Sequence, residues 1–104
     1  MLKKGDLCKH FKGTNLDEKN IYEIIEVGVN YSGDNAEKPI VNLVVYKNIF
    51  QGKIFAREID DLIAELPKEK QVQYGQVHRV EKLTDDEIEY VNNRLNKLKG
   101  NEEV

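Results

Sequence analysis

Residues 40–57 read Ile-Val-Asn-Leu-Val-Val-Tyr-Lys-Asn-Ile-Phe-Gln-Gly-Lys-Ile-Phe-Ala-Arg, the densest run of β-branched and aromatic residues in the chain. Such side chains suit the pleated, half-buried surface of a β-sheet. A turn over 48–52, which contains Asn48 and Gly52, interrupts the run. We therefore expect two antiparallel strands, 40–47 and 53–57, joined as a hairpin around which the rest of the chain is arranged.

The register of this hairpin decides which side chains share a face. With a loop of about six residues, Val45 lies opposite Ala56 and Tyr46 lies opposite Phe55. Alternation then directs one apolar set toward the core: Val41, Leu43, Val45, Ile54 and Ala56. It places Tyr46, Phe55 and Arg57 together on the outer face, where opposed side chains interact. A slip of one residue would invert both assignments.

Two earlier segments are expected to extend the sheet. Strand 7–12 would direct Leu7 and Phe11 inward, because alternate side chains of a strand share one face. Strand 21–29 is rich in isoleucine and valine. Gly28 within it predicts a bulge or bend, of the kind that curls a small sheet into a barrel.

The segments on either side of the hairpin are less regular. Breaker residues predict a loop over 30–39. Apolar residues at helical spacing in 58–66 predict one or two helical turns that end at Pro67. Segment 68–75 is polar and is expected to be a connector, and 77–83 alternates weakly, as a last strand would.

A helix over 84–99 is expected to follow. Thr84 and Glu87 have the spacing of a capping box, in which each side chain bonds the backbone of the other residue. The apolar residues of this segment form one narrow stripe: Ile88, Val91, Leu95 and Leu98. Gly100 fits the position just after a helix.

These elements predict a mainly β fold. Residues 1–83 would form a small five-stranded SH3-like barrel with a short helical turn after the fourth strand. Helix 84–99 would pack on this barrel, and 100–104 would be a disordered tail. Pairing of the helix with a second chain is the alternative, because an isolated helix of this length is marginal in water.

Composition limits the class of protein. The 104 residues indicate one domain, and 39% hydrophobic with 34% charged residues is an ordinary composition for a soluble protein. The single cysteine, the lack of an apolar start and the lack of a spanning segment predict a cytoplasmic protein. The net charge of −3 gives no general affinity for nucleic acid.

Four short motifs occur in the order found in a small bacterial family. They are Lys9-His10-Phe11-Lys12-Gly13, Ile21-Tyr22-Glu23-Ile24-Ile25, Leu43-Val44-Val45-Tyr46 and Ile54-Phe55-Ala56-Arg57. Over about residues 3–83 the chain resembles domain-of-unknown-function family 1653 (DUF1653), whose members resemble SH3-type barrels. Glu58 stands where that family usually has proline, and Asp60-Asp61-Leu62 replaces its usual Glu-Met-Phe run. The resemblance implies a fold and no established activity.

Cys8 and His10 would share one strand face, as a thiol nucleophile and its base or as two metal ligands. A zinc site needs about four ligands, and only His78 and scattered carboxylates remain. Nucleophilic catalysis also needs an orienting group and an oxyanion site. We therefore predict no metal site, no cofactor and no enzyme, and treat Cys8 as a small apolar residue. An enzyme that uses Cys8 and His10 is the least favoured alternative.

A second alternative is a protein that binds single-stranded nucleic acid. Such proteins combine basic side chains with rings on which bases stack. The chain offers a modest set of this kind: Lys9, Lys12, Arg57, Phe11, Tyr46 and Phe55. The acidic net charge and the lack of a long basic stripe weigh against this function.

The preferred prediction is a non-enzymatic binding or accessory module that contacts a protein or peptide. Its candidate binding residues are His10, Lys12, Tyr46, Phe55 and Arg57, on the outer face of the hairpin and beside it. Two of them also allow a structural role. His10 could be tied to a neighbouring strand, and the stem of Arg57 could merely cover the aromatic rings. A monomer is favoured.

Overall fold

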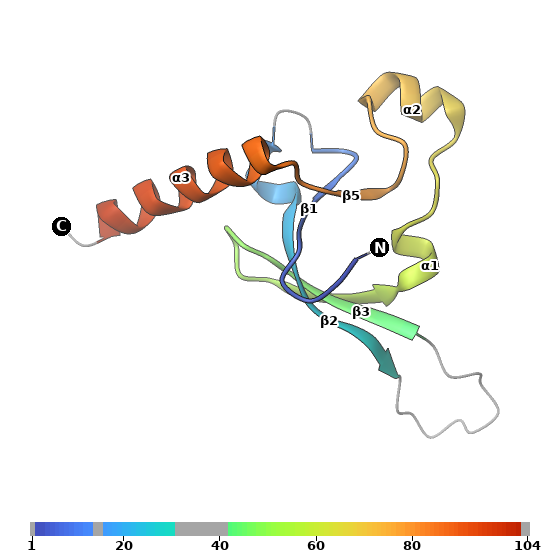
Figure 1. The fold of residues 1–104 in the computed structure, drawn as a ribbon, viewed down its shortest axis with the longest axis horizontal. Helices are drawn as coiled ribbons and strands as arrows, with labels where there is room; N and C mark the ends of the chain where they lie inside the picture. Colours follow the sequence, from blue (N-terminus) through green and yellow to red (C-terminus); the bar gives the residue numbers. More distant parts are fainter. Residues whose placement is uncertain (1, 14–15, 31–41, 103–104) are drawn as a thin grey trace.

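The computed structural model describes residues 2–13, 16–30 and 42–102, which form one antiparallel sheet with helices around it (Figure 1). The elements are β1 (Leu7–His10), the 3-10 helix η2 (Glu18–Asn20), β2 (Ile21–Asn30), β3 (Asn42–Asn48), β4 (Ile54–Glu58), α1 (Ile59–Leu62), α2 (Lys68–Tyr74), β5 (Val80–Lys82) and α3 (Asp85–Glu102). Four predicted features lie outside the described residues: most of loop 30–39, the strand start at 40 and 41, the core position Val41, and the end of the tail at 103–104.

The five predicted strands are present in one sheet with the order β4-β3-β2-β1-β5, so the mainly β prediction is confirmed. The first and last strands are shorter than expected. Closure into a barrel is not shown, because β4 and β5 are the two edges of the described sheet. The SH3-like assignment therefore stays a prediction.

Strand β2 is the long strand that joins the two halves of the sheet, and it bends as expected. Its register against β3 shifts between Val27 and Val29, on either side of Gly28. Gly28 has a φ of 77°, a backbone conformation that residues with a Cβ rarely adopt. The bulge predicted at this glycine is confirmed.

The predicted hairpin register is confirmed, with Val45 opposite Ala56 and Tyr46 opposite Phe55. The assignment of its faces is wrong. Val44, on the face expected to be the outer one, is fully buried, whereas Ile54 on the expected inner face is 64% exposed. Leu62 of α1 joins Val44 in one buried cluster and covers this side of the sheet. Both faces of β3 carry apolar residues, so the strand alone did not reveal which face would be covered.

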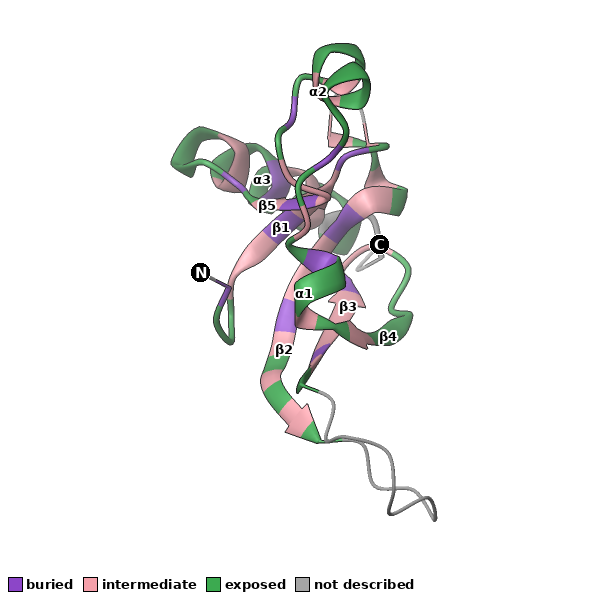
Figure 2. Cartoon of the chain, turned by 90° about the vertical axis from the view of Figure 1, so that its right-hand side faces the viewer, coloured by how far each residue is buried: buried purple, intermediate pink, exposed green. Residues whose placement is uncertain are grey.

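Two apolar clusters, one on each side of the sheet, form the core. Figure 2 marks the buried residues along the strands and helices. The first contains Leu2, Cys8, Ile24, Val44, Leu62 and Val80. The second contains Ile21, Leu83 and Val91, with Ile88 and Leu95 of α3 packed against it. Strand β1 contributes to both clusters, because Cys8 belongs to the first and Leu7 packs against the second.

Helix α3 begins as predicted and continues further. Thr84 and Glu87 form the capping box, with the Glu87 amide donating to Thr84 Oγ1 at 3.3 Å and the Thr84 amide donating to Glu87 Oε1 at 2.9 Å. Gly100 does not end the helix, which runs to Glu102 and includes part of the expected tail. The helix extends away from the sheet (Figure 1), and Leu98 is 43% exposed.

The predicted connector 68–75 is wrong, because the segment forms α2. Pro67 precedes the helix and Gly75 ends it in the left-handed conformation, with a φ of 67°. Val72 of α2 is 86% exposed, so no apolar stripe marked this helix in the sequence. Among the described helices, none is long and apolar enough to cross a membrane.

Candidate binding surface

Three aromatic side chains from three adjacent strands gather on the α1 side of the sheet. Tyr46 and Phe55 are stacked, with ring centroids 5.6 Å apart and an interplanar angle of 25°. Tyr22 of β2 meets both rings edge-on, at 5.1 Å from Tyr46 and 6.1 Å from Phe55. We call Tyr22, Tyr46 and Phe55 the aromatic face.

The aromatic face is partly open to solvent. Phe55 is 41% exposed and both tyrosines are half-buried. Burial raises the pKa of Tyr22 and of Tyr46, so both phenols stay protonated at neutral pH. Sequence reasoning missed Tyr22, because its position beside Tyr46 depends on the β2–β3 register, in which Ile24 is opposite Tyr46.

Arg57 lies at the edge of the aromatic face and is paired with Asp61 of α1. Its Nε donates to Asp61 Oδ2, across one turn from β4 into the helix. This hydrogen bond raises the pKa of Arg57 and lowers the pKa of Asp61. Asp61 thereby holds the guanidinium near Tyr46.

His10 lies at the end of β1, between the aromatic face and a second group of side chains. Its Nδ1 accepts a hydrogen bond from the Lys12 amide at 3.2 Å. Burial, together with the positive charges of Arg79, Lys12 and Arg57, lowers the pKa of His10 to about 4. The imidazole is therefore neutral at pH 7, with its proton on Nε2, because Nδ1 is an acceptor.

Phe11 is the centre of that second group. The charged ends of three side chains lie near its ring centroid: Lys12 at 5.9 Å, Lys70 at 5.5 Å and Arg79 at 6.0 Å. His10 packs on Phe11 at 4.5 Å between centroids. We call Lys12, Lys70 and Arg79 the cation cluster.

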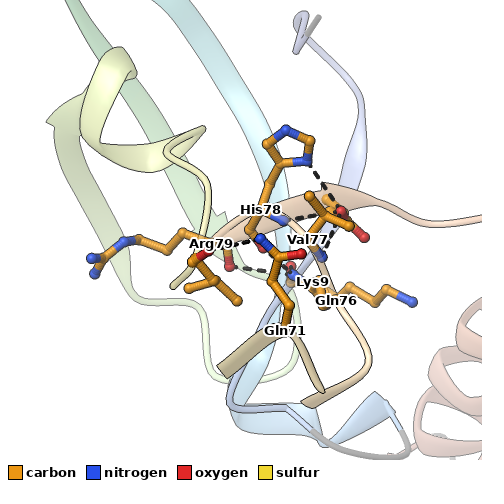
Figure 3. A network of polar contacts seen from close by, with 8 residues as sticks. Lys9, Gln71, Gln76, Val77, His78 and Arg79 are labelled. Atoms are coloured by element: carbon orange, nitrogen blue, oxygen red, sulfur yellow. Dashed lines mark hydrogen bonds and ion pairs between the residues drawn. The ribbon is translucent and has the colours of Figure 1, made fainter. Parts of the chain in front are cut away.

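Gln76 fixes the backbone from which Arg79 projects. Its buried Nε2 donates to three carbonyl oxygens: Lys9 at 3.3 Å, His78 at 2.9 Å and Arg79 at 3.3 Å. Figure 3 shows these contacts, with the guanidinium of Arg79 directed away from them. The Phe11 amide also donates to the Arg79 carbonyl at 2.9 Å, so the same network aligns Phe11 with Arg79.

The sequence did not indicate that Lys70 and Arg79 belong to this surface. Both depend on the placement of α2 and of the chain before β5, which no periodicity revealed. Lys9, by contrast, does not join Lys12 and Arg57, although the nucleic-acid alternative predicts that it does. It points to the other side of the sheet, where its Nζ pairs with Glu87 Oε2 at 2.9 Å.

Cys8 offers no exposed thiolate beside His10. Its side chain is fully buried, and burial, with the nearby charge of Asp6, raises its pKa to about 12. A cysteine nucleophile reacts as the thiolate, which this environment disfavours. Among the described residues, no group of three histidine, cysteine, aspartate or glutamate side chains is arranged to hold a metal ion.

Two pockets lie away from the aromatic face. One of about 300 Å³ is lined by Leu2, Ile63 and Val80 together with the His78–Glu81 pair. The other, of about 380 Å³, lies between β1, Gln76 and Glu87. Neither includes a predicted binding residue, so the candidate site is an open surface and not one of these pockets.

The strand register places His10, Tyr46, Phe55 and Arg57 on one side of the sheet, and Lys12 follows just beyond the end of β1. Tyr46, Phe55 and Arg57 lie together, and the charge of Arg57 acts on His10, whose Nδ1 bonds the Lys12 backbone. Comparisons with protein families, with curated proteins and with solved structures give no match for this chain.

Proposed function

We propose that this protein is a non-enzymatic binding module that contacts a peptide segment of a partner protein through the aromatic face and Arg57. The observation that carries the proposal is the exposed ring of Phe55 stacked on Tyr46. Aromatic residues and arginine are enriched in protein interfaces and dominate their binding energy.

The aromatic face is ordered before any partner arrives. Each of its rings contacts the other two, and Asp61 fixes Arg57 beside them. Side chains already held in place lose little conformational entropy on binding, which favours affinity. Tyr22 is fixed further, because its hydroxyl donates to the Lys19 carbonyl at 3.2 Å.

The resemblance to DUF1653 supports the choice of this surface as the binding site. Its motifs contribute His10 and Lys12 from the first segment, Tyr22 from the second, and Tyr46 and Arg57 from the hairpin. All five residues lie on or beside the aromatic face. The strand order with a bend at Gly28 is also what an SH3-like barrel requires, and we retain that fold as part of the proposal.

A peptide-display selection tests the proposal with two variants of one strand. Phe55→Ala removes the exposed ring of the aromatic face. Ile54→Ala is the matched control, because Ile54 directly precedes Phe55, is more exposed and points to the opposite side of the sheet. Wild type and Ile54→Ala should select the same peptides, and Phe55→Ala should not retain them. Equal retention by all three proteins would contradict the proposal.

Single-stranded nucleic acid is a second candidate, and the cation cluster around Phe11 is the observation that favours it. Charges beside rings are typical of such platforms. This function predicts retention on a single-stranded DNA column that falls steeply as salt rises. No retention at low salt would exclude it.

A further inference from the structure

We infer that the peptide bound by the aromatic face carries an acidic side chain, which is bound by the cation cluster and Arg57. The inference rests on the proposed function and adds the chemical class of the ligand.

Positive charge gathers on this side of a protein whose net charge is −3. Lys12, Lys70 and Arg79 lie around one ring, and Arg57 is close enough to act on the same histidine as Lys12 and Arg79. Such a concentration of one charge raises the local potential, which attracts an oppositely charged ligand group.

Little of this charge is compensated within the described residues. Asp61 pairs with Arg57, and the positive charge of Arg79 also lowers the pKa of Asp61. Lys12 and Lys70 are exposed and form no ion pair with a described residue. The buried Nε of Arg79 has no hydrogen-bond partner among these residues. The cluster therefore has ammonium groups available for an added carboxylate.

His10 provides a neutral donor between the two parts of the surface. Its Nδ1 is engaged by the Lys12 amide, so its Nε2–H is the group left to bond an anion. A carboxylate placed there would contact a donor and nearby cations together. Hydrogen bonds to an ionised group are stronger than those between neutral groups.

The geometry favours an acidic peptide over a nucleic acid. A strand of nucleic acid needs successive open rings and a basic groove along its backbone. Here the rings of the aromatic face pack against one another, Phe55 is the exposed one, and Phe11 is only 4% exposed. The cations surround a single ring instead of forming a stripe. One aromatic contact beside one anionic contact matches a short peptide segment.

The test uses the peptide-display library with the full chain and two double variants. Lys12→Gln/Lys70→Gln removes two exposed charges of the cluster. Lys19→Gln/Lys99→Gln removes the same charge from exposed positions elsewhere. Wild type and the control should enrich peptides that have an acidic residue next to apolar ones. The cluster variant should bind those peptides roughly three- to tenfold more weakly, the effect of two partly exposed ion pairs.

Each other outcome overturns a defined part of the proposal. Enrichment of apolar peptides without acidic residues would contradict the inference and leave the proposed function standing. Acidic enrichment that is unchanged in the cluster variant would place the anion elsewhere. No enrichment at all would reject the proposed function itself. Retention on single-stranded DNA that the cluster variant abolishes would assign the charges to nucleic acid instead.

Discussion

On the side of the sheet that carries α1, one half is covered by this helix and the other half is open to solvent. In the first half, Ile24 and Val44 are buried under Leu62 of α1. In the second half, Tyr46 and Phe55 continue the same face, yet Phe55 is 41% exposed. Helix α1 has only four residues, which is enough to cover Val44 and leaves the aromatic rings uncovered. The two halves show that a strand residue becomes part of the core when a neighbouring helix covers it. The strand sequence alone does not decide this.

The largest loss of stability is expected from a substitution in the half that α1 covers. Ile24→Ala removes a side chain that is fully buried in the first cluster and should lower the free energy of unfolding by about 2–5 kcal/mol. Chemical denaturation monitored by circular dichroism measures the change. A loss below about 1 kcal/mol would mean that this half is not packed as described.

Asn48 should have a smaller effect, because it supports the hairpin through hydrogen bonds. Its Oδ1 accepts from the amides of Phe50 and Gln51, and its Nδ2 donates to the Glu18 carbonyl at 3.0 Å. Asn48→Ala leaves these partly buried groups without their partner and should destabilise the fold by about 1–3 kcal/mol. Asn42→Ala, at the exposed start of the same strand, is the control and should change stability little. Equal losses in both variants would contradict the prediction.

His10 should make stability depend on pH in a defined window. Its pKa is about 4 in the folded protein, against an ordinary value of about 6.5 in the unfolded chain. Between these values the unfolded chain binds more protons, so the free energy of unfolding should fall as the pH drops from about 6.5 to about 4.

His10→Gln isolates this contribution, because the carboxylates are the same in both proteins. The variant should have a flatter dependence of unfolding free energy on pH in that window, measured by denaturation at several pH values. Identical slopes would show that the histidine is not held neutral by burial and by the charges of Arg79, Lys12 and Arg57.

Arg57→Ala should have the smallest effect on stability. The pair with Asp61 is largely exposed, and such pairs contribute about 0.2–1 kcal/mol. Asp61→Asn should reproduce this small change in thermal unfolding. A large loss in the arginine variant alone would indicate that the stem of Arg57 supports the rings, which is the structural alternative.

Much of the fold could be predicted from sequence, where local chemistry decides it. The turn length determined the pairing of Tyr46 with Phe55, and Thr84 with Glu87 marked the start of α3. The faces of β3 could not be assigned, because Val44 and Val45 are equally apolar and only α1 distinguishes them. Gly100 suggested a helix end, but the helix continues through it.

Only some residues of the candidate surface could be predicted from the sequence, because the others are placed by contacts between distant segments. Tyr46, Phe55 and Arg57 follow from one hairpin, whose geometry is local. Tyr22 needed the register of a neighbouring strand. Lys70 and Arg79 reach Phe11 through α2 and the Gln76 network, which depend on contacts between distant segments. Polar helices and buried amide networks leave no periodic pattern in a sequence.

The most direct test of the central claim measures peptide affinity on the two faces of β4. A peptide selected by the wild-type protein is titrated into Phe55→Ala and Ile54→Ala, after circular dichroism confirms that both are folded. We expect Phe55→Ala to lose at least about tenfold in affinity and Ile54→Ala to match the wild type, because one ring belongs to the aromatic face and the other side chain points away. Equal affinities in the two variants, or a loss confined to Ile54→Ala, would contradict the assignment of binding to the open half of this face.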